Sequence, residues 1–115
     1  MTTDKMEKEN VVGMLASSKE PDLAQAVELA LADSRLLDEI LKGMLSKNET
    51  YRYNCYKVLF RISSDTPQVL YPEWEYFVEL LGSPNSYHRM AAINIIANHR
   101  IQASARSRQT ISINI

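Results

Sequence analysis

The sequence predicts an all-α fold, and three observations support this class. Three glycines and four prolines in 115 residues are too few turn-formers for a many-stranded sandwich or barrel. Leu, Ala, Glu, Lys, Met and Arg, which favour helices, recur throughout the chain. Apolar residues also return at steps of three and four, the spacing that aligns side chains on one face of a helix. A hydrophobic content of 45% and a net charge of −1 are typical of one globular domain.

Three helices are predicted in the first half of the chain, over residues 5–16, after Pro21, and after Asp33 and Ser34. Pro21 suits a first helical turn because its missing N–H has no partner there. Asp33 and Ser34 are typical N-cap residues. The third helix has the clearest apolar stripe, made of Leu36, Leu37, Ile40, Leu41, Met44 and Leu45.

Two further helices are predicted around residues 49–63 and after Thr66. The fourth helix has a second apolar stripe of Tyr53, Tyr56 and Phe60, and a helix apolar on two faces is usually sandwiched between neighbours. The fifth has Thr66 as its cap and Pro67 at its first position, and the ring of Pro72 should bend it.

The sixth predicted helix opens with Ser83 as cap and Pro84 in its first turn, and it is apolar nearly all round. Residues 99–115 lack helical periodicity and contain three arginines and no acid, so they are predicted to form a basic, disordered tail or a non-native end. Residues 1–98 then hold 10 basic and 14 acidic residues, a net charge of −4.

The chain also contains an internal repeat, which becomes visible when it is shifted by 36 residues. The shift aligns Ile40, Leu41, Met44 and Leu45 with Tyr76, Phe77, Leu80 and Leu81, and Tyr51, Arg52, Cys55 and Tyr56 with Tyr87, His88, Ala91 and Ala92. It places Arg89 at the position that corresponds to Tyr53. A helix pair that repeats with the same apolar positions is expected to stack on copies of itself.

The aligned helix pairs resemble the HEAT and armadillo repeat family. The second helix of such repeats typically opens with an aliphatic residue and Arg, a pattern matched by Tyr51 and Arg52 and, with His in place of Arg, by Tyr87 and His88. Pro72 is similar to the kinking proline of the family's first helices. The resemblance implies a short right-handed α-solenoid of about three antiparallel helix pairs in one domain, 1–98, at residues 5–31, 34–63 and 67–98.

A candidate partner-binding stripe lies on the fourth helix. Tyr53, Lys57 and Arg61 are spaced four residues apart and so share one face, and Arg89 occupies the Tyr53-equivalent place in the sixth helix. The resemblance implies that the second helices line a concave surface. Tyrosine provides a large, rigid contact area with a polar tip, which favours partner contact, and the alternative is an ordinary solvated face.

The sequence shows no pattern typical of an enzyme, metal or cofactor site. It contains no Gly-rich phosphate loop or nucleophile turn, and Cys55, His88 and His99 lie on separate elements. We therefore predict no catalytic residue, cofactor or small-molecule substrate. Some HEAT-like folds are DNA glycosylases with a basic concave surface, whereas residues 1–98 are acidic. Nucleic-acid binding through the basic tail is the alternative, and the near-neutral total charge argues against it.

We expect a non-enzymatic protein-interaction module or scaffold. The partner would bind the concave face or the end of the sixth helix, whose apolar residues no capping repeat covers: Met90, Ile93, Ile95 and Ile96. A longer repeat array, self-association, a partner or an altered C-terminus would each explain that end. A single Cys, a polar N-terminus and short apolar runs predict a cytoplasmic protein without membrane insertion, with the nucleus left open.

Overall fold

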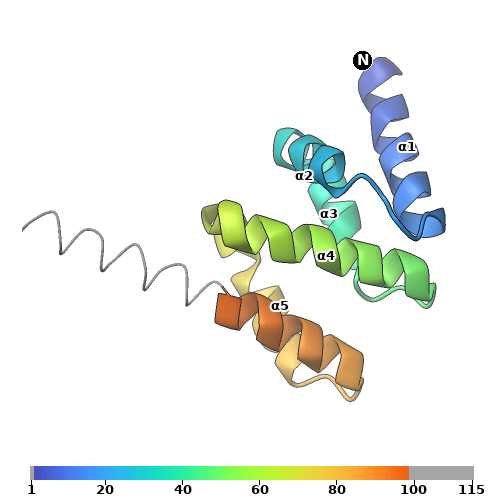
Figure 1. Ribbon diagram of the computed structural model, residues 1–115. Helices are drawn as coiled ribbons and strands as arrows, with labels where there is room; N and C mark the ends of the chain where they lie inside the picture. Colours follow the sequence, from blue (N-terminus) through green and yellow to red (C-terminus); the bar gives the residue numbers. More distant parts are fainter. Residues whose placement is uncertain (1, 99–115) are drawn as a thin grey trace, which may run out of the picture. The chain divides into compact units, whose positions relative to one another are not determined.

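The computed structural model describes residues 2–98, with side chains described from Lys8 onward (Figure 1). All regular structure in this part is helical, and residues 2–98 contain no strand. The predicted all-α class is therefore confirmed for this part. The predicted basic tail lies outside the described residues.

Helices α1 to α5 and one 3-10 helix precede a last α-helix over residues 86–98. Their bounds are α1 Thr2–Ser17, α2 Leu23–Ala32, α3 Ser34–Gly43, α4 Glu49–Asp65, η1 Pro67–Glu73 and α5 Trp74–Leu81. The chain divides into two compact units, with the boundary between Arg61 and Ile62 inside α4.

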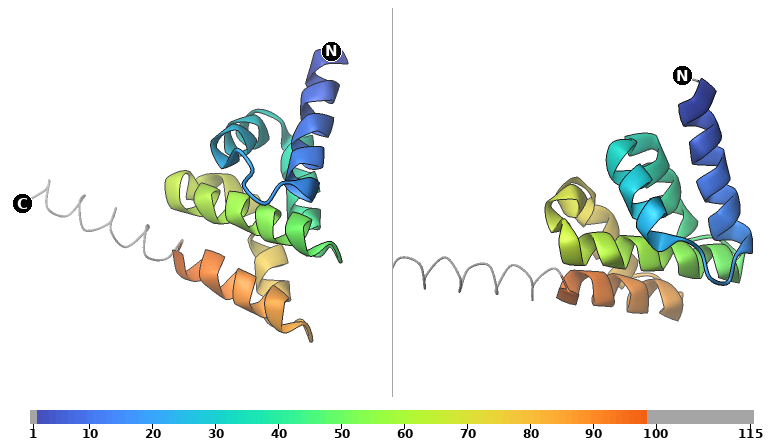
Figure 2. Two further views of the ribbon diagram at one scale, coloured as in Figure 1. Left: turned by 45° about the vertical axis from the view of Figure 1, so that its right-hand side comes forward. Right: turned by 45° about the horizontal axis from the view of Figure 1, so that its top comes forward.

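In the first unit, the amphipathic helix α3 contacts both α1 and α2 (Figure 2). The predicted stripe of α3 is buried except for Leu45, which is exposed. The buried apolar residues of this unit are Val11, Leu15, Ala26, Ala30, Leu36, Leu37, Ile40, Leu41, Met44, Cys55, Val58 and Leu59. A helix with one wide apolar face thus forms the centre of the unit, as its periodicity predicts.

Aspartate side chains begin α2 and α3. The Asp22 carboxylate accepts a 3.1 Å hydrogen bond from the Gln25 backbone N–H. The Asp33 carboxylate accepts from the Arg35 N–H at 2.9 Å, while the Asp33 N–H donates to the Leu29 carbonyl at 3.0 Å. Asp33 therefore ends one helix and starts the next, which confirms it as a cap. Pro21 precedes the Asp22 cap, so its predicted place in the first helical turn is wrong.

The second unit contains η1, α5 and the 86–98 helix around its own core. Its buried residues include Ile62, Pro67, Leu70, Phe77, Leu80, Ala91, Ala92 and Ile95. Pro67 occupies the first turn of η1, as predicted, and the segment around Pro72 is 3-10 helical before the α-helix restarts at Trp74. Thr66 lies at the N-cap position of η1, as predicted, but its side chain accepts no hydrogen bond from the N–H groups of this helix.

The start of the last helix also differs from the prediction. Asn85 caps it, since its side-chain oxygen accepts from the N–H groups of Tyr87 at 2.8 Å and His88 at 3.2 Å. Ser83 Oγ instead accepts from the Asn85 N–H at 3.1 Å, so Ser83 and Pro84 belong to the turn before the helix.

Candidate interaction surface on α4

The turn before α4 is held by three side chains. Ser46 Oγ accepts from the Asn48 N–H at 3.1 Å, and Asn48 Oδ1 caps α4 by accepting from the Tyr51 N–H at 3.1 Å. The Arg52 guanidinium then reaches back one and a half turns, where Nη1 donates to the Ser46 carbonyl at 3.1 Å. Together these bonds fix the entry of the chain into α4 and the direction of its first turns.

The turn before the 86–98 helix repeats this arrangement. Ser83 Oγ accepts from the Asn85 N–H and Asn85 Oδ1 from the His88 N–H, as Ser46 and Asn48 do, and Nη1 of Arg89 donates to the Ser83 carbonyl at 2.7 Å. Arg89 therefore corresponds to Arg52, at a spacing of 37 residues rather than 36. The placement of Arg89 opposite Tyr53 is wrong.

Relative to the buried residues before it, the 86–98 helix begins one residue later than α4 does, which explains the change of spacing. Buried Leu41 and Met44 still match buried Phe77 and Leu80 at 36 residues, so the insertion follows α5, where Gly82 lies. At a spacing of 37, His88 corresponds to Tyr51. The imidazole Nδ1 of His88 lies 3.1 Å from Ser83 Oγ, which makes His88 a further member of the turn.

Three of the four predicted partner-binding residues lie on the part of α4 that belongs to the first unit. Tyr53 is 54% exposed, Arg61 is exposed and Lys57 is half-buried. The Lys57 ammonium lies 4.7 Å from the centre of the Tyr53 ring, a cation–π contact. Arg89 lies in the second unit and holds its own turn, so it is not shown to join this surface.

The aromatic residues of the second α4 stripe contact one another along the helix. The rings of Tyr53 and Tyr56 meet edge to face with centroids 6.4 Å apart, and those of Tyr56 and Phe60 are tilted at 5.9 Å. Phe60 is 37% exposed. The stripe predicted to be sandwiched is therefore partly open to solvent, which is unusual for contiguous aromatic side chains.

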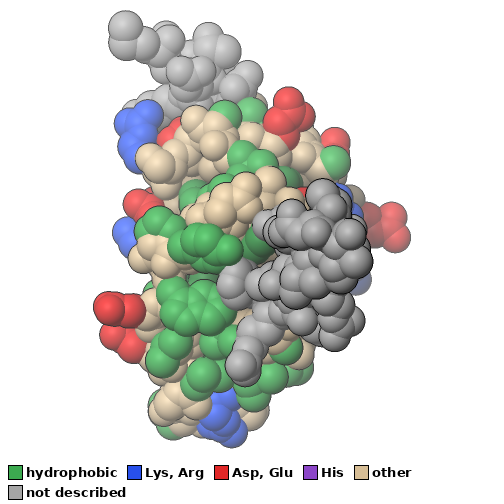
Figure 3. Space-filling model, turned by 90° about the vertical axis from the view of Figure 1, so that its left-hand side faces the viewer, with side chains coloured by type: hydrophobic (Ala, Val, Ile, Leu, Met, Phe, Trp, Pro, Cys, Tyr) green, Lys and Arg blue, Asp and Glu red, His purple; other side chains and the backbone are tan. Residues whose placement is uncertain are grey.

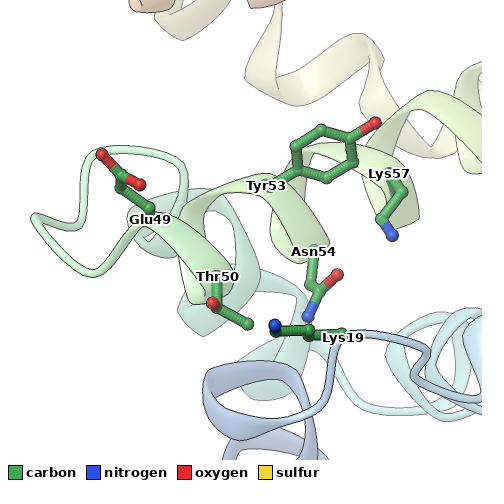
Figure 4. A pocket seen from close by; sticks show the side chains of 6 residues that line it. All are labelled: Lys19, Glu49, Thr50, Tyr53, Asn54 and Lys57. Carbon is green, nitrogen blue, oxygen red and sulfur yellow. The ribbon is translucent and has the colours of Figure 1, made fainter.

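Tyr53 and Lys57 line an open groove of about 390 Å³ in the first unit (Figure 4). Its lining residues are Lys19, Glu49, Thr50, Tyr53, Asn54 and Lys57. Figure 4 shows Glu49 at the far end of the row, pointing away from Lys57, with Lys19 on the α1–α2 connection below Thr50 and Asn54. Spacing along the sequence gives no sign that Lys19 belongs to this groove, because only the fold brings it to α4.

Asn54 joins α4 to the end of α1. This side chain is 2% exposed, and its Nδ2 donates to the carbonyls of Leu15 and Ser18, both at 2.8 Å. Nδ2 of Asn48 donates to the carbonyl of Ala16 at 3.3 Å. The last carbonyls of a helix have no partner within it, so two asparagine amides take that role here.

The cations at this surface lack a carboxylate partner within the described residues. The ion pairs of the described residues join Lys8 to Glu39 at 4.0 Å and Arg35 to Asp33 at 3.7 Å. Neither pair involves Lys19, Lys57 or Arg61. The surface therefore combines partly exposed aromatic rings with positive charge that the described acids do not neutralise.

Cys55 and Tyr51 lie in a tight apolar site against Gly43. Burial raises the pKa of the Cys55 thiol to about 12, although its hydrogen bond with Tyr51 acts in the opposite direction. Burial is also the main reason that the pKa of Tyr51 is raised, with the neighbouring thiol adding to it. A thiol that stays protonated is a poor nucleophile, so Cys55 is a core residue rather than a reactive site, with the half-buried Tyr51 packed beside it. Tyr87, the residue that the 36-residue shift aligns with Tyr51, is also half-buried.

Apolar side chains also reach the surface of the 86–98 helix. Met90 is 46% exposed and Ile93 54% exposed, and Ala97 continues the same face. Ile95, by contrast, is buried and Ile96 half-buried, so only part of the predicted uncovered set is open. Figure 3 shows apolar side chains at the molecular surface.

Comparisons with protein-family models, with curated proteins and with solved structures find no match to this chain. Residues 2–98 hold no group of three or more His, Cys, Asp or Glu side chains placed to bind a metal ion. In the same part of the chain, every helix is too short or too polar to cross a bilayer.

Proposed function

We propose that the protein is a non-enzymatic protein-interaction module, a short HEAT-like α-solenoid that binds its partner at the α4 surface. The likeness of the two turns supports the repeat, because Ser, Asn and Arg recur there with the same hydrogen bonds. Bonds of this kind set how each second helix follows its first, and repeated units of this kind are expected to stack.

The observation that carries the binding proposal is the exposure of Tyr53 beside Lys57 in the α4 groove. Interface hot spots are enriched in tyrosine that combines a rigid ring with a polar tip. Here the ring contacts both Tyr56 and Lys57, so little side-chain entropy is lost when a partner covers it.

Selection of short random peptides displayed on phage, with the full chain as bait, tests this proposal. Peptides that bind this surface should bind the Tyr53→Ser variant at least about tenfold more weakly, a loss of ~1.4 kcal/mol. Tyr71→Ser is the matched control, because Tyr71 is 51% exposed and lies outside the groove. Equal binding to the wild-type chain and the Tyr53→Ser variant would refute the assignment of the α4 surface.

The exposed face of the 86–98 helix supports a second binding mode, self-association. Met90 and Ile93 lie on adjacent turns and present two large apolar side chains to solvent. We expect the full chain to form dimers in light scattering coupled to size exclusion, and Ile93→Glu to return it to a monomer. A wild-type monomer at high concentration would exclude this mode.

A further inference from the structure

We infer that the partner at the α4 surface is an acidic peptide segment that also carries apolar side chains. The inference rests on the proposed function and adds the chemistry of the ligand. The first observation behind it is the position of the cationic side chains at this surface. Lys19 and Lys57 line one groove, and Arg61 follows one turn after Lys57 on α4.

None of these three side chains forms an ion pair with a carboxylate of the described residues. Lys57 is instead held over the Tyr53 ring, which orients its ammonium without cancelling its charge. Lys19 follows the end of α1, whose carbonyls at Leu15 and Ser18 already accept hydrogen bonds from Asn54. Neither ammonium group forms an ion pair with a carboxylate of the described residues, so both can donate hydrogen bonds to a carboxylate of a bound peptide.

Glu49, the acidic residue of the groove, does not conflict with the binding of an acidic peptide. Figure 4 shows its carboxylate at the end of the row, directed away from Lys57. It lies in the first turn of α4, where the helix dipole stabilises a negative charge. Lys57 thus lies at the opposite end of the row from Glu49, with Lys19 below the residues between them.

The aromatic residues define the rest of the ligand and favour a peptide over a nucleic acid. Tyr53, Tyr56 and Phe60 contact one another, and Lys57 covers a face of Tyr53, so these rings do not form an open platform for stacked bases. They offer ring edges and apolar surface, which suit an aliphatic or aromatic side chain.

The composition of the selected peptides tests this inference separately from the proposed function. Peptides that depend on Tyr53 should be enriched in Asp and Glu, and replacing these by Asn and Gln should weaken binding at least about tenfold. Lys57→Glu and Lys19→Glu should each weaken binding by a similar factor, and added salt should weaken it further. Lys47→Glu, an exposed charge reversal outside the groove, should leave binding unchanged.

Three results would overturn the inference. Peptides that depend on Tyr53 but carry no acidic enrichment would refute the ligand chemistry and leave the binding surface standing. An oligothymidylate that binds with the same dependence on Lys57 as the peptides, or more tightly, would favour a nucleic acid. Failure to select any peptide that depends on Tyr53 would refute the proposed function itself. Circular dichroism of each variant confirms that the fold is intact.

Discussion

Replacing Asn54 with Ala should destabilise the first unit by breaking the link between α4 and the end of α1. The side chain is 2% exposed and donates two 2.8 Å hydrogen bonds to carbonyls at the end of α1. Its loss leaves the Leu15 carbonyl buried without this donor, at a cost of ~1–3 kcal/mol, while the half-buried bond to Ser18 contributes ~1 kcal/mol. Ala favours a helix over Asn by ~0.5 kcal/mol, so the net loss is ~1.5–3.5 kcal/mol.

Urea denaturation followed by far-UV circular dichroism measures this loss as a change in the free energy of unfolding. Hydrogen exchange should locate it, with faster exchange in the last turn of α1. Asn10→Ala is the matched control, because Asn10 is exposed on α1 and its replacement should be neutral. A loss below ~0.5 kcal/mol for Asn54→Ala would show that the two bonds do not hold α1 to α4.

The isosteric change Asn54→Asp sharpens the test, because it keeps the shape and replaces the donor with an acceptor. The new carboxylate would face two carbonyl oxygens, so its folded-state pKa should lie above the unfolded value of about 3.9. The destabilisation should therefore grow as the pH rises through that value and shrink in more acidic solution. A pH-independent loss would contradict the proposed geometry.

Three more predictions follow from the turns and the core. Gly43→Ala should lower the free energy of unfolding by ~1–3 kcal/mol, because a Cβ there would overlap Cys55 Sγ and approach the Tyr51 ring to 2.9 Å. Adding Cys55→Ala to this variant should recover part of the loss, since it removes the overlapping sulfur atom. The Cys55 thiol should not react with a disulfide reagent at pH 8 until the chain unfolds. The free energy of unfolding should fall as the pH rises from about 8.5 toward the folded-state pKa of about 12, because only the unfolded thiol loses its proton in that range. A free energy of unfolding that does not change over this range would refute the raised pKa. Arg52→Met and Arg89→Met should each lower the midpoint of thermal unfolding, and an unchanged midpoint would show that the bonds across the turns contribute nothing.

The sequence predicted local features better than long-range ones. The stripe of α3 and the Asp33 cap were predictable, because periodicity and capping depend on neighbours within one or two turns. Fixed-period alignment failed after Gly82, since one added residue rotates every later side chain by about 100° around a helix. That rotation led to the wrong partner for Arg89.

The groove could be predicted only in part. Tyr53 and Lys57 share a helical face, so their spacing was informative. Lys19 is separated from them by two intervening helices, and Asn54 looks like an ordinary polar residue until its partners at the end of α1 are known. Contacts between residues more than thirty positions apart depend on tertiary packing, which spacing along one helix does not encode.

Asn48 links helix ends of opposite polarity. Its side-chain oxygen accepts from the N–H of Tyr51 in the first turn of α4, and its amide nitrogen donates to the carbonyl of Ala16 near the end of α1. Aspartate could supply the first bond but not the second, because an ionised carboxylate only accepts. At Asn85 the bonds of the described chain use only the acceptor, so aspartate would serve. Exchange of Asn for Asp during evolution should therefore be permitted at position 85 and restricted at position 48.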